Sequence, residues 1–200
     1  MTDLAWTGWA LAALLAALIA LWVVWGAASR LDRLHRRVRE SRATLDAQLV
    51  RRATAAWDLA TSGILDPASS IVIAATARDA LDQTPAADIS AGVSDGGTAE
   101  LGAADDIERA LAESELSRAL REALGRSEDR AALAAADGAA DLLGTLDREW
   151  YRVQLARRFH NDAVVAVRRI RAKGYVRLLR LAGRAEVPVT FEMDDETGAP

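Results

Sequence analysis

The sequence predicts an all-α protein in which an N-terminal transmembrane helix continues into an antiparallel bundle of long helices. Between Asp3 and Arg30 the chain carries no charged residue, and a helix needs roughly 20 mostly apolar residues to cross a bilayer core of about 30 Å. After Arg30, apolar residues recur at spacings of three and four, the pattern of a helix with one buried face. We therefore divide the chain into an anchor (1–29), a bundle (30–183) and a C-terminal tail (184–200).

Tryptophans mark both ends of the predicted anchor. Trp6 and Trp9 lie at one end and Trp22 and Trp25 at the other, and residues 6 to 25 span about 28 Å at 1.5 Å per residue. Indole rings prefer the headgroup boundary, so these four are predicted membrane-interface residues. The alternative is a signal peptide cleaved at the small residues 27–29, which would release an extracytoplasmic helical domain. The apolar run exceeds the signal-peptide core of about 7–15 residues and no basic residue precedes it, which favours a retained anchor.

Arginines crowd the carboxyl side of the anchor. Those predicted to lie at the membrane interface are Arg30, Arg33, Arg36 and Arg37, and Arg39 and Arg42 follow them. Because positive flanks stay in the cytoplasm, the N-terminus is predicted outside the cell membrane and the C-terminal domain inside. The lipid bilayer is thus the first predicted partner.

A second candidate partner is another copy of the chain. Ala12, Ala16 and Ala20 form a small-xxx-small ridge, which would allow a homo-oligomer through the transmembrane helix. The chain is so rich in alanine that chance is the better explanation of this ridge.

Composition excludes several kinds of chemistry. The chain has no cysteine, so disulfides, thiolate metal sites and thiol nucleophiles are excluded. The net charge of −4 hides an asymmetry, because residues 88–149 are acidic whereas residues 151–184 hold ten Arg and Lys residues and a single carboxylate.

The bundle begins with two predicted helices, over about 30–62 and 66–83. The first continues the anchor, and its arginines are predicted to face water. Its apolar stripe is Leu31, Leu34, Val38, Leu45, Leu49, Ala53, Ala56 and Ala60. Gly63 ends it, and Asp66 and Pro67 open the next helix as N-cap and first helical residue. The run 71–73 alone would also suit a strand, but this start signal favours a helix.

Three further helices are predicted, over about 99–124, 128–173 and 174–182. A mobile loop, rich in Gly, Ala, Asp and Ser, is predicted over 84–98. Gly138 and Gly144 interrupt the long helix at about 1 kcal/mol each relative to alanine, which predicts a bend there. Pro188 argues against a central strand over 187–191.

The fourth helix carries a family resemblance. Arg152-Val153, followed by residues 156–164 with Asn161-Asp162-Ala163-Val164, resembles the signature of the LemA family. Leu49-Val50-Arg51-Arg52 and Phe191-Glu192 also fit that layout. His160, Val167-Arg168 and Gly174-Tyr175 depart from it. The resemblance implies a single-pass membrane protein with a cytoplasmic bundle of long helices and no established activity, and it brings no catalytic residues.

The sequence indicates no catalytic, cofactor-binding or metal-binding residues. Its two histidines, His35 and His160, lack Cys, Asp or Glu at metal-ligand spacing, and no phosphate-binding loop or nucleophile elbow is present. His160 lies close to the buried stripe, which favours a hydrogen-bonded interhelical histidine. The carboxylates at 105–106 and 194–196 are predicted to be solvated.

One group of residues is a candidate for a structural or partner-contact role. Its members are Arg152, Arg157, Arg158, His160, Asn161 and Asp162. Asn161 and Arg157 share a helix face beside the core. We expect Asn161 to fix the helix register by bonding across the bundle, and Arg157 to pair with the acidic third helix.

A basic amphipathic segment near the end of the chain is predicted to touch the inner leaflet. Its candidate contacts are Lys173, Tyr175, Arg177, Arg180 and Arg184. The alternative, that it packs against the end of the bundle, is equally consistent with the pattern. A nucleic-acid-binding role for this basic run is disfavoured, because aromatic residues are sparse and the acidic half would repel phosphates.

These features together predict a membrane-anchored scaffold or adaptor without catalytic activity. Its bundle would face an unidentified protein partner in the cytoplasm or the membrane.

Overall fold

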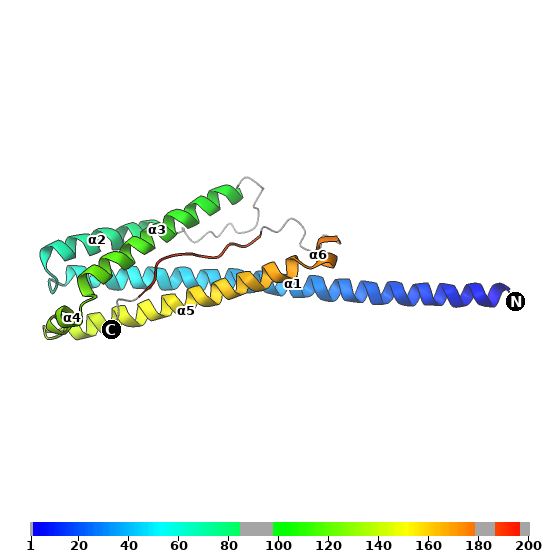
Figure 1. Cartoon of the computed structure of the whole chain (residues 1–200), viewed down its shortest axis with the longest axis horizontal. Coiled ribbons are helices and arrows are strands. Elements are labelled where there is room, and N and C mark those ends of the chain that lie inside the picture. Colours follow the sequence, from blue (N-terminus) through cyan, green and yellow to red (C-terminus); the bar gives the residue numbers. More distant parts are fainter. Residues whose placement is uncertain (1, 85–97, 179–186, 197–200) are drawn as a thin grey trace. The chain divides into compact units, whose positions relative to one another are not determined.

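The computed structural model describes residues 2–84, 98–178 and 187–196. Across these residues the chain is helical and forms no strand, which confirms the all-α prediction (Figure 1). The helices are α1 (Thr2–Thr61), α2 (Pro67–Asp82), α3 (Thr98–Leu124), α4 (Ser127–Ala134), α5 (Ala139–Arg171) and α6 (Gly174–Leu178). The predicted loop over 84–98 lies outside the described residues except at its two ends.

The predicted signals between the first two helices are confirmed. Gly63, just past the end of α1, adopts φ +78°, a left-handed conformation that glycine adopts without strain. The side chain of Asp66 caps α2 by accepting hydrogen bonds from the backbone N–H groups of Ala68 and Ser69, each at 3.0 Å. The hydrogen bonds from Ser69 lower the pKa of Asp66, and Pro67 is the first residue of the helix.

The predicted single helix over 128–173 is wrong. α4 ends at Ala134 and α5 begins at Ala139, because Gly138 adopts φ +75° and so leaves the right-handed helical region. Gly144 remains inside α5. A helical glycine costs only about 1 kcal/mol, so burial of the neighbouring turns decides which glycine breaks the helix. Ala139 and Leu143 are buried, whereas α4 has no buried residue.

The chain folds into two compact units. Unit 1 comprises Met1–Glu40 and Asp162–Pro188, and unit 2 comprises Ser41–Asn161 and Val189–Pro200. The core of unit 1 is aliphatic and joins α1, the last turns of α5 and α6. Its buried members are Leu31, Val38, Ala163, Val164, Val167 and Val176.

Unit 2 has two apolar clusters. The larger is built from alanine and leucine of α1, α2, α3 and α5 and includes Leu59, Ile73, Leu116 and Leu146. The smaller joins α1 and α5 to the end of the described chain. Its buried members are Leu45, Leu49, Val153, Ala156, Phe191 and Met193.

Within the predicted tail over 184–200, the described residues 189–196, which we call the strap, pack into unit 2. Phe191 and Met193 of the strap are only 2% and 8% exposed. The strap is extended, so residues 191, 193 and 195 are buried, whereas Glu192 and Glu196 are exposed and Asp194 is half-buried.

The N-terminal part of α1 carries a segment long and apolar enough to cross a membrane. Leu14, Leu15, Leu18 and Leu21 are each more than half exposed and lie on one broad side of the helix, and Ile19 and Val23, which are 55% and 51% exposed, lie on the far side. The tryptophans Trp9, Trp22 and Trp25 are 77%, 73% and 69% exposed, while the side chain of Trp6 lies outside the described residues.

Candidate functional site

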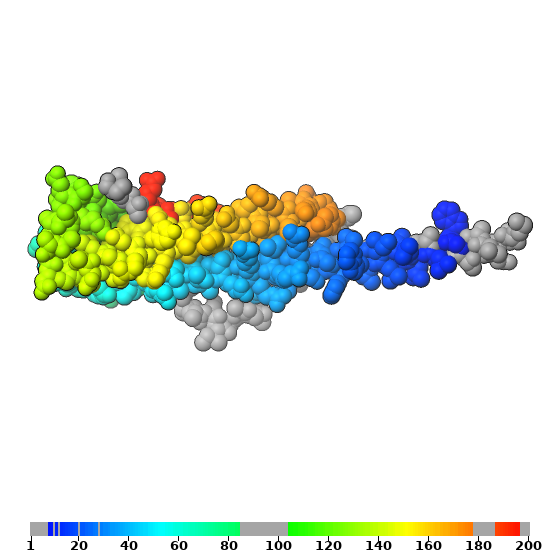
Figure 2. Space-filling view, turned by 90° about the horizontal axis from the view of Figure 1, so that it is seen from below, coloured from blue at the N-terminus to red at the C-terminus, as the bar shows by residue number. Residues whose placement is uncertain are grey.

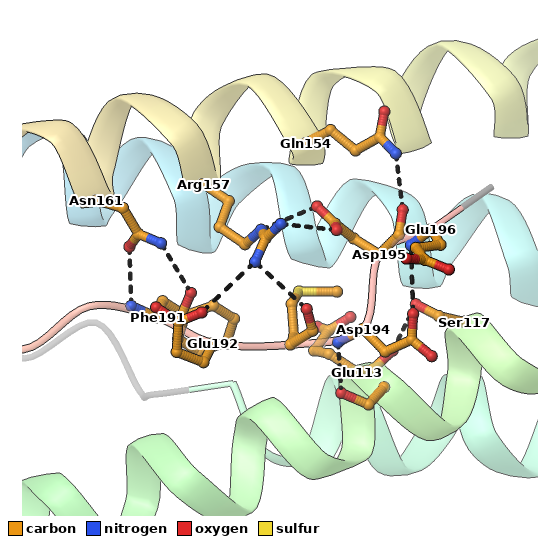
Figure 3. Close-up of polar contacts among 12 residues, drawn as sticks. Glu113, Ser117, Gln154, Arg157, Asn161, Phe191, Glu192, Asp194, Asp195 and Glu196 are labelled. Carbon is orange, nitrogen blue, oxygen red and sulfur yellow. Dashed lines mark hydrogen bonds and ion pairs between the residues drawn. The ribbon is translucent and has the colours of Figure 1, made fainter.

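The strap is held first by Asn161 of α5. The Asn161 Oδ1 atom accepts a hydrogen bond from the backbone N–H of Phe191 at 2.9 Å, and Nδ2 donates to the Phe191 carbonyl at 3.2 Å (Figure 3). One amide side chain thus satisfies both backbone groups of an extended residue. The expected bond from Asn161 across the helix bundle is replaced by this bond to the strap.

Arg157, one turn away on the same helix, binds the carboxylate of Asp195. Its Nε and Nη2 atoms donate to Oδ2 and Oδ1 of Asp195 at 2.9 and 2.8 Å (Figure 3). Trp150 Nε1 and Gln154 Nε2 donate to the Asp195 carbonyl oxygen at 3.0 and 2.7 Å. A two-point arginine–carboxylate pair is among the stronger polar contacts in proteins.

The other edge of the strap is bound by α3. Arg121 Nη1 donates to Oδ1 of Asp194 at 2.9 Å, and Ser114 Oγ accepts from the Asp194 backbone N–H at 3.0 Å. Hydrogen bonding by Arg121 lowers the pKa of Asp194. The strap therefore ties α3 to α5 within unit 2.

Two sequence predictions are corrected by these contacts. Asp195 is only 8% exposed and is paired with Arg157, so the carboxylates at 194–196 are not merely solvated. Arg157 accordingly pairs with the strap and not with the acidic α3. The signal that could have found this is the alternation of Phe191, Met193 and Asp195, which is typical of an extended chain with one buried face.

A buried ion pair joins α1 to α3. Arg52, which is 0% exposed, donates from Nη2 to Oε2 of Glu113 at 2.6 Å and from Nη1 to Oγ of Ser117 at 2.9 Å. Its guanidinium also lies over the ring of Trp150, 5.4 Å from the ring centroid. Burial raises the pKa of Glu113, against the opposing effect of Arg52. The prediction that the arginines of the first bundle helix face water is wrong at Arg52.

A second charged cluster lies nearby along α1. Arg109, 1% exposed, places Nη1 at 3.1 Å from Oδ1 of Asp46, and Arg42 Nε lies 3.2 Å from the same atom. Arg42 also binds Asp106 and lies 5.0 Å from the ring centroid of Phe191 in the strap. Burial lowers the pKa of Arg109. Asp106 is therefore an ion-pair partner, contrary to its predicted solvation.

His160 is the hydrogen-bonded interhelical histidine that the sequence predicts. Its side chain is buried, and Nδ1 shares a hydrogen bond of 3.2 Å with Oγ of Ser41 on α1. Burial, followed by the nearby charge of Arg42, lowers the pKa of His160. Both effects favour the neutral form of the ring.

The six candidate residues of α5 divide between two faces. Arg157, His160 and Asn161 face the interior of unit 2 and hold the strap or α1, as described above. Arg152, Arg158 and Asp162 are exposed, and Arg152 pairs with Glu149 of its own helix at 2.6 Å.

The predicted membrane-facing residues are also exposed where the structure describes them. They are Arg30, Arg33, Arg36, Arg37, Lys173, Tyr175 and Arg177. Val176, between two of them, is buried in the same cluster as Leu31. Arg180 and Arg184 lie outside the described residues.

A groove of about 510 Å³ is formed at the end of unit 2 by the turn between α1 and α2, the end of α3, and α4. Its lining includes Leu65, Ala123, Leu133, Glu122, Arg126 and Asp129. These side chains offer apolar contact and a charged rim. Among the described residues, no three His, Cys, Asp or Glu side chains are grouped to hold a metal ion.

Comparison of the chain with models of known protein families, with curated proteins and with solved structures gives no match.

Proposed function

We propose that this chain is a single-pass, membrane-anchored helical scaffold, of the type that its resemblance to the LemA family implies. The start of α1 lies in the bilayer, the N-terminus lies outside, and the remaining helices present a surface to a protein partner in the cytoplasm. The role is structural and not catalytic.

The observation that carries this proposal is the exposed apolar segment at the start of α1. Its leucines are exposed on one side of the helix, and Ile19 and Val23 are exposed on the far side, whereas Leu31 marks the start of the buried core of unit 1. Fully burying one leucine is worth about 1.5–3 kcal/mol relative to water, so a helix that is apolar all round needs a nonpolar surrounding. Exposed indoles at Trp9, Trp22 and Trp25 suit the two headgroup boundaries.

The charge after this segment supports the orientation. Arg30, Arg33, Arg36 and Arg37 are exposed directly after the apolar run, and positive flanks favour the cytoplasmic side. In unit 1, α6 packs through Val176 into the cluster that contains Leu31. This packing brings Lys173, Tyr175 and Arg177 toward the same end of the apolar run, where anionic lipid would attract the two cations.

The polar and charged side chains of α5 that face the interior of unit 2 support a structural role for the protein. Arg157 and Asn161 use their polar atoms to hold the strap, and His160 is buried against Ser41. The surface that remains for a partner is formed by the exposed faces of the helices.

Cysteine labelling in cells tests the anchor and its orientation, because the chain has no cysteine of its own. Thr2→Cys and Glu128→Cys variants are expressed in a bacterial host and treated with a membrane-impermeant maleimide. We expect Cys at position 2 to react in intact spheroplasts and Cys at position 128 to react only after permeabilisation. Reaction at 128 in intact spheroplasts contradicts the proposed orientation.

The same preparations test the retained anchor. We expect the chain to stay with the membrane pellet after an alkaline carbonate wash, with an intact mass that includes residues 1–29. A mature chain that begins near residue 30 and washes off would instead support the cleaved signal peptide.

A separate experiment tests whether the segment around Tyr175 contacts the inner leaflet of the membrane. A Tyr175→Cys variant, labelled with a polarity-sensitive fluorophore, is reconstituted into vesicles with and without anionic lipid. We expect a blue shift only with anionic lipid, lost at about 1 M salt where the Debye length falls to about 3 Å. An unchanged spectrum rules out the leaflet contact and leaves packing against the bundle.

A further inference from the structure

The outer face of α5 in unit 2 carries an apolar stripe bordered by positive charge. Tyr151, Leu155 and Phe159 follow one another at intervals of four residues and are 66%, 40% and 55% exposed. Residues four apart lie on the same side of a helix, and Figure 2 shows this part of α5 (yellow) open at the surface. The stripe is bordered by the exposed arginines Arg148, Arg152 and Arg158. We call these six residues the basic stripe.

The outer face of α3 carries an apolar pair bordered by negative charge. Ile107 and Leu111, also four apart, are 62% and 59% exposed. Glu108 and Glu115 are exposed beside them, and neither forms an ion pair with a described residue. We call these four residues the acidic stripe. The exposed Arg118 lies one turn beyond its end.

The two stripes lie at the same level along α1. At one end, Arg42 binds Asp106 just before the acidic stripe, and Ser41 binds His160 just after the basic stripe. At the other end, Arg52 binds Glu113 of α3 and lies over Trp150 of α5. Residues 107–111 and 151–159 are thus both bracketed by the stretch 41–52. Figure 1 shows α3 (green) and this part of α5 (yellow) on either side of α1 (cyan).

We propose that a second copy of this chain covers these stripes, with the acidic stripe of one copy packed on the basic stripe of the next. Opposite charge borders two apolar surfaces, whereas pairing two basic stripes would bring arginines together. Because the stripes share one level, a sideways shift of one copy in the membrane plane brings them face to face. Such a head-to-tail contact uses two different surfaces and extends into a row or closes into a ring.

This contact rests on the proposed membrane anchor. The stripes hold only six and four residues, against roughly 20–30 residues per partner in a standard interface, so they are too small to hold free copies together at high dilution. Confinement to one membrane raises the effective concentration of each copy for the other, and this compensates for a weak contact.

Disulfide cross-linking in membranes tests the contact with the full chain. Leu111→Cys and Leu155→Cys variants, carrying different epitope tags, are co-expressed and oxidised briefly. We expect a cross-linked dimer that carries both tags, because the two positions lie on facing stripes. Pairs with the same substitution in both copies are expected to cross-link at least about fivefold less. Equal yields from the same-substitution pairs would overturn the head-to-tail arrangement.

A matched control uses an exposed position on α1, which runs beside both stripes. Ala47 is exposed on α1 between Arg42 and Arg52, so Ala47→Cys with Leu155→Cys measures chance collision in the same membrane. We expect a yield at least about fivefold below that of the Leu111 and Leu155 pair. A yield as high as that pair means that the cross-link reports crowding and overturns the proposal.

Charge reversal tests the complementarity. Arg148→Glu with Arg158→Glu in the Leu155→Cys copy is expected to lower the mixed cross-link about fivefold or more. Glu108→Arg with Glu115→Arg in the Leu111→Cys copy is expected to restore it. A mixed yield that neither change alters overturns the proposal.

Membrane fractionation of the same cells separates this proposal from the anchor on which it rests. A membrane-bound chain without the mixed cross-link overturns only the contact between copies. A chain that is found in the soluble fraction overturns the anchor, and a mixed cross-link there would still support the contact.

Discussion

The buried side chains of unit 1 and unit 2 differ in kind. The core of unit 1 consists of valine, leucine and alanine. The buried polar and charged side chains among the described residues all belong to unit 2, and they are Arg52, Arg109, Glu113, Ser117, Glu149, His160 and Asp195.

The difference shows two ways in which the position of one helix along its packed neighbour is fixed. Apolar contact is non-directional and scales with buried area, so an aliphatic core tolerates small shifts of one helix along another. A buried ion pair such as Arg52 with Glu113 is satisfied at one register only. We infer that the charges of unit 2 select the pairing of its helices, while the apolar clusters supply most of its stability.

Arg52→Met gives the largest expected effect, because it leaves the buried Glu113 without its cation. We expect the free energy of unfolding to fall by about 3–5 kcal/mol, measured by denaturant unfolding of the full chain in detergent micelles. The double variant Arg52→Met with Glu113→Leu is expected to recover most of the loss, since apolar packing replaces the pair. A single variant that costs under about 1 kcal/mol would remove the contrast between the units.

Val164→Ala tests the aliphatic side of the comparison. Val164 is 0% exposed in the core of unit 1, and we expect its truncation to cost about 2–3 kcal/mol through lost contact and a cavity. Val164→Ile is expected to cost less than about 1.5 kcal/mol, because volume and not direction matters here. The same unfolding measurement checks both, and a larger loss for Ile than for Ala would contradict this account.

Asn161→Ala tests the attachment of the strap. The change removes two partly buried hydrogen bonds to Phe191, and we expect a loss of about 2 kcal/mol at about 1 kcal/mol each. Hydrogen exchange of the amide of Phe191 is expected to accelerate. Asp162→Ala, next to it but exposed, is the control and is expected to stay within about 0.5 kcal/mol of the unaltered chain.

His160 gives the smallest effect, and it depends on pH. Its pKa in the folded chain lies below the ordinary value of 6.5, so the unfolded chain takes up the proton first. The stabilising contribution is complete above pH 6.5 and is lost as the pH falls through the lowered pKa. Arg42 strengthens this shift, whereas Asp46 and Asp106 oppose it.

The measurement is the free energy of unfolding of the unaltered chain and of His160→Gln between pH 7.5 and 5.5. We expect the unaltered chain to lose more stability than the variant over this range, because only the unaltered chain carries the imidazole with the lowered pKa. Glu113 acts in the opposite direction, because its raised pKa removes stability as the pH rises above 4.5. Parallel curves for the two chains would show that His160 does not titrate in this range.

Local signals in the sequence predicted much of the fold. The apolar run, the N-cap at Asp66 and the stop at Gly63 depend on residues a few positions apart, so they can be identified from the sequence. The burial of Arg52 depends on Glu113, 61 positions away, and no local pattern shows that pairing. The break at Gly138 in place of Gly144 depends likewise on which turns find a core.

The site was predicted only in part. Sequence reasoning selected Arg157 and Asn161 but assigned them partners on other helices, because the strap has only a short alternating pattern that includes Asp195. Its role emerges only when α3 and α5 are close enough for one extended segment to reach both.

The position of the strap in the chain has a consequence for synthesis. Residues 189–196 follow every helix that they join, so during translation the apolar start of α1 leaves the ribosome long before the segment that ties α3 to α5. With the membrane anchor proposed above, the start of α1 enters the bilayer before the carboxylates that bind Arg157 and Arg121 have been synthesised. Chains that stop before residue 189 lack every contact by which the strap joins α3 to α5.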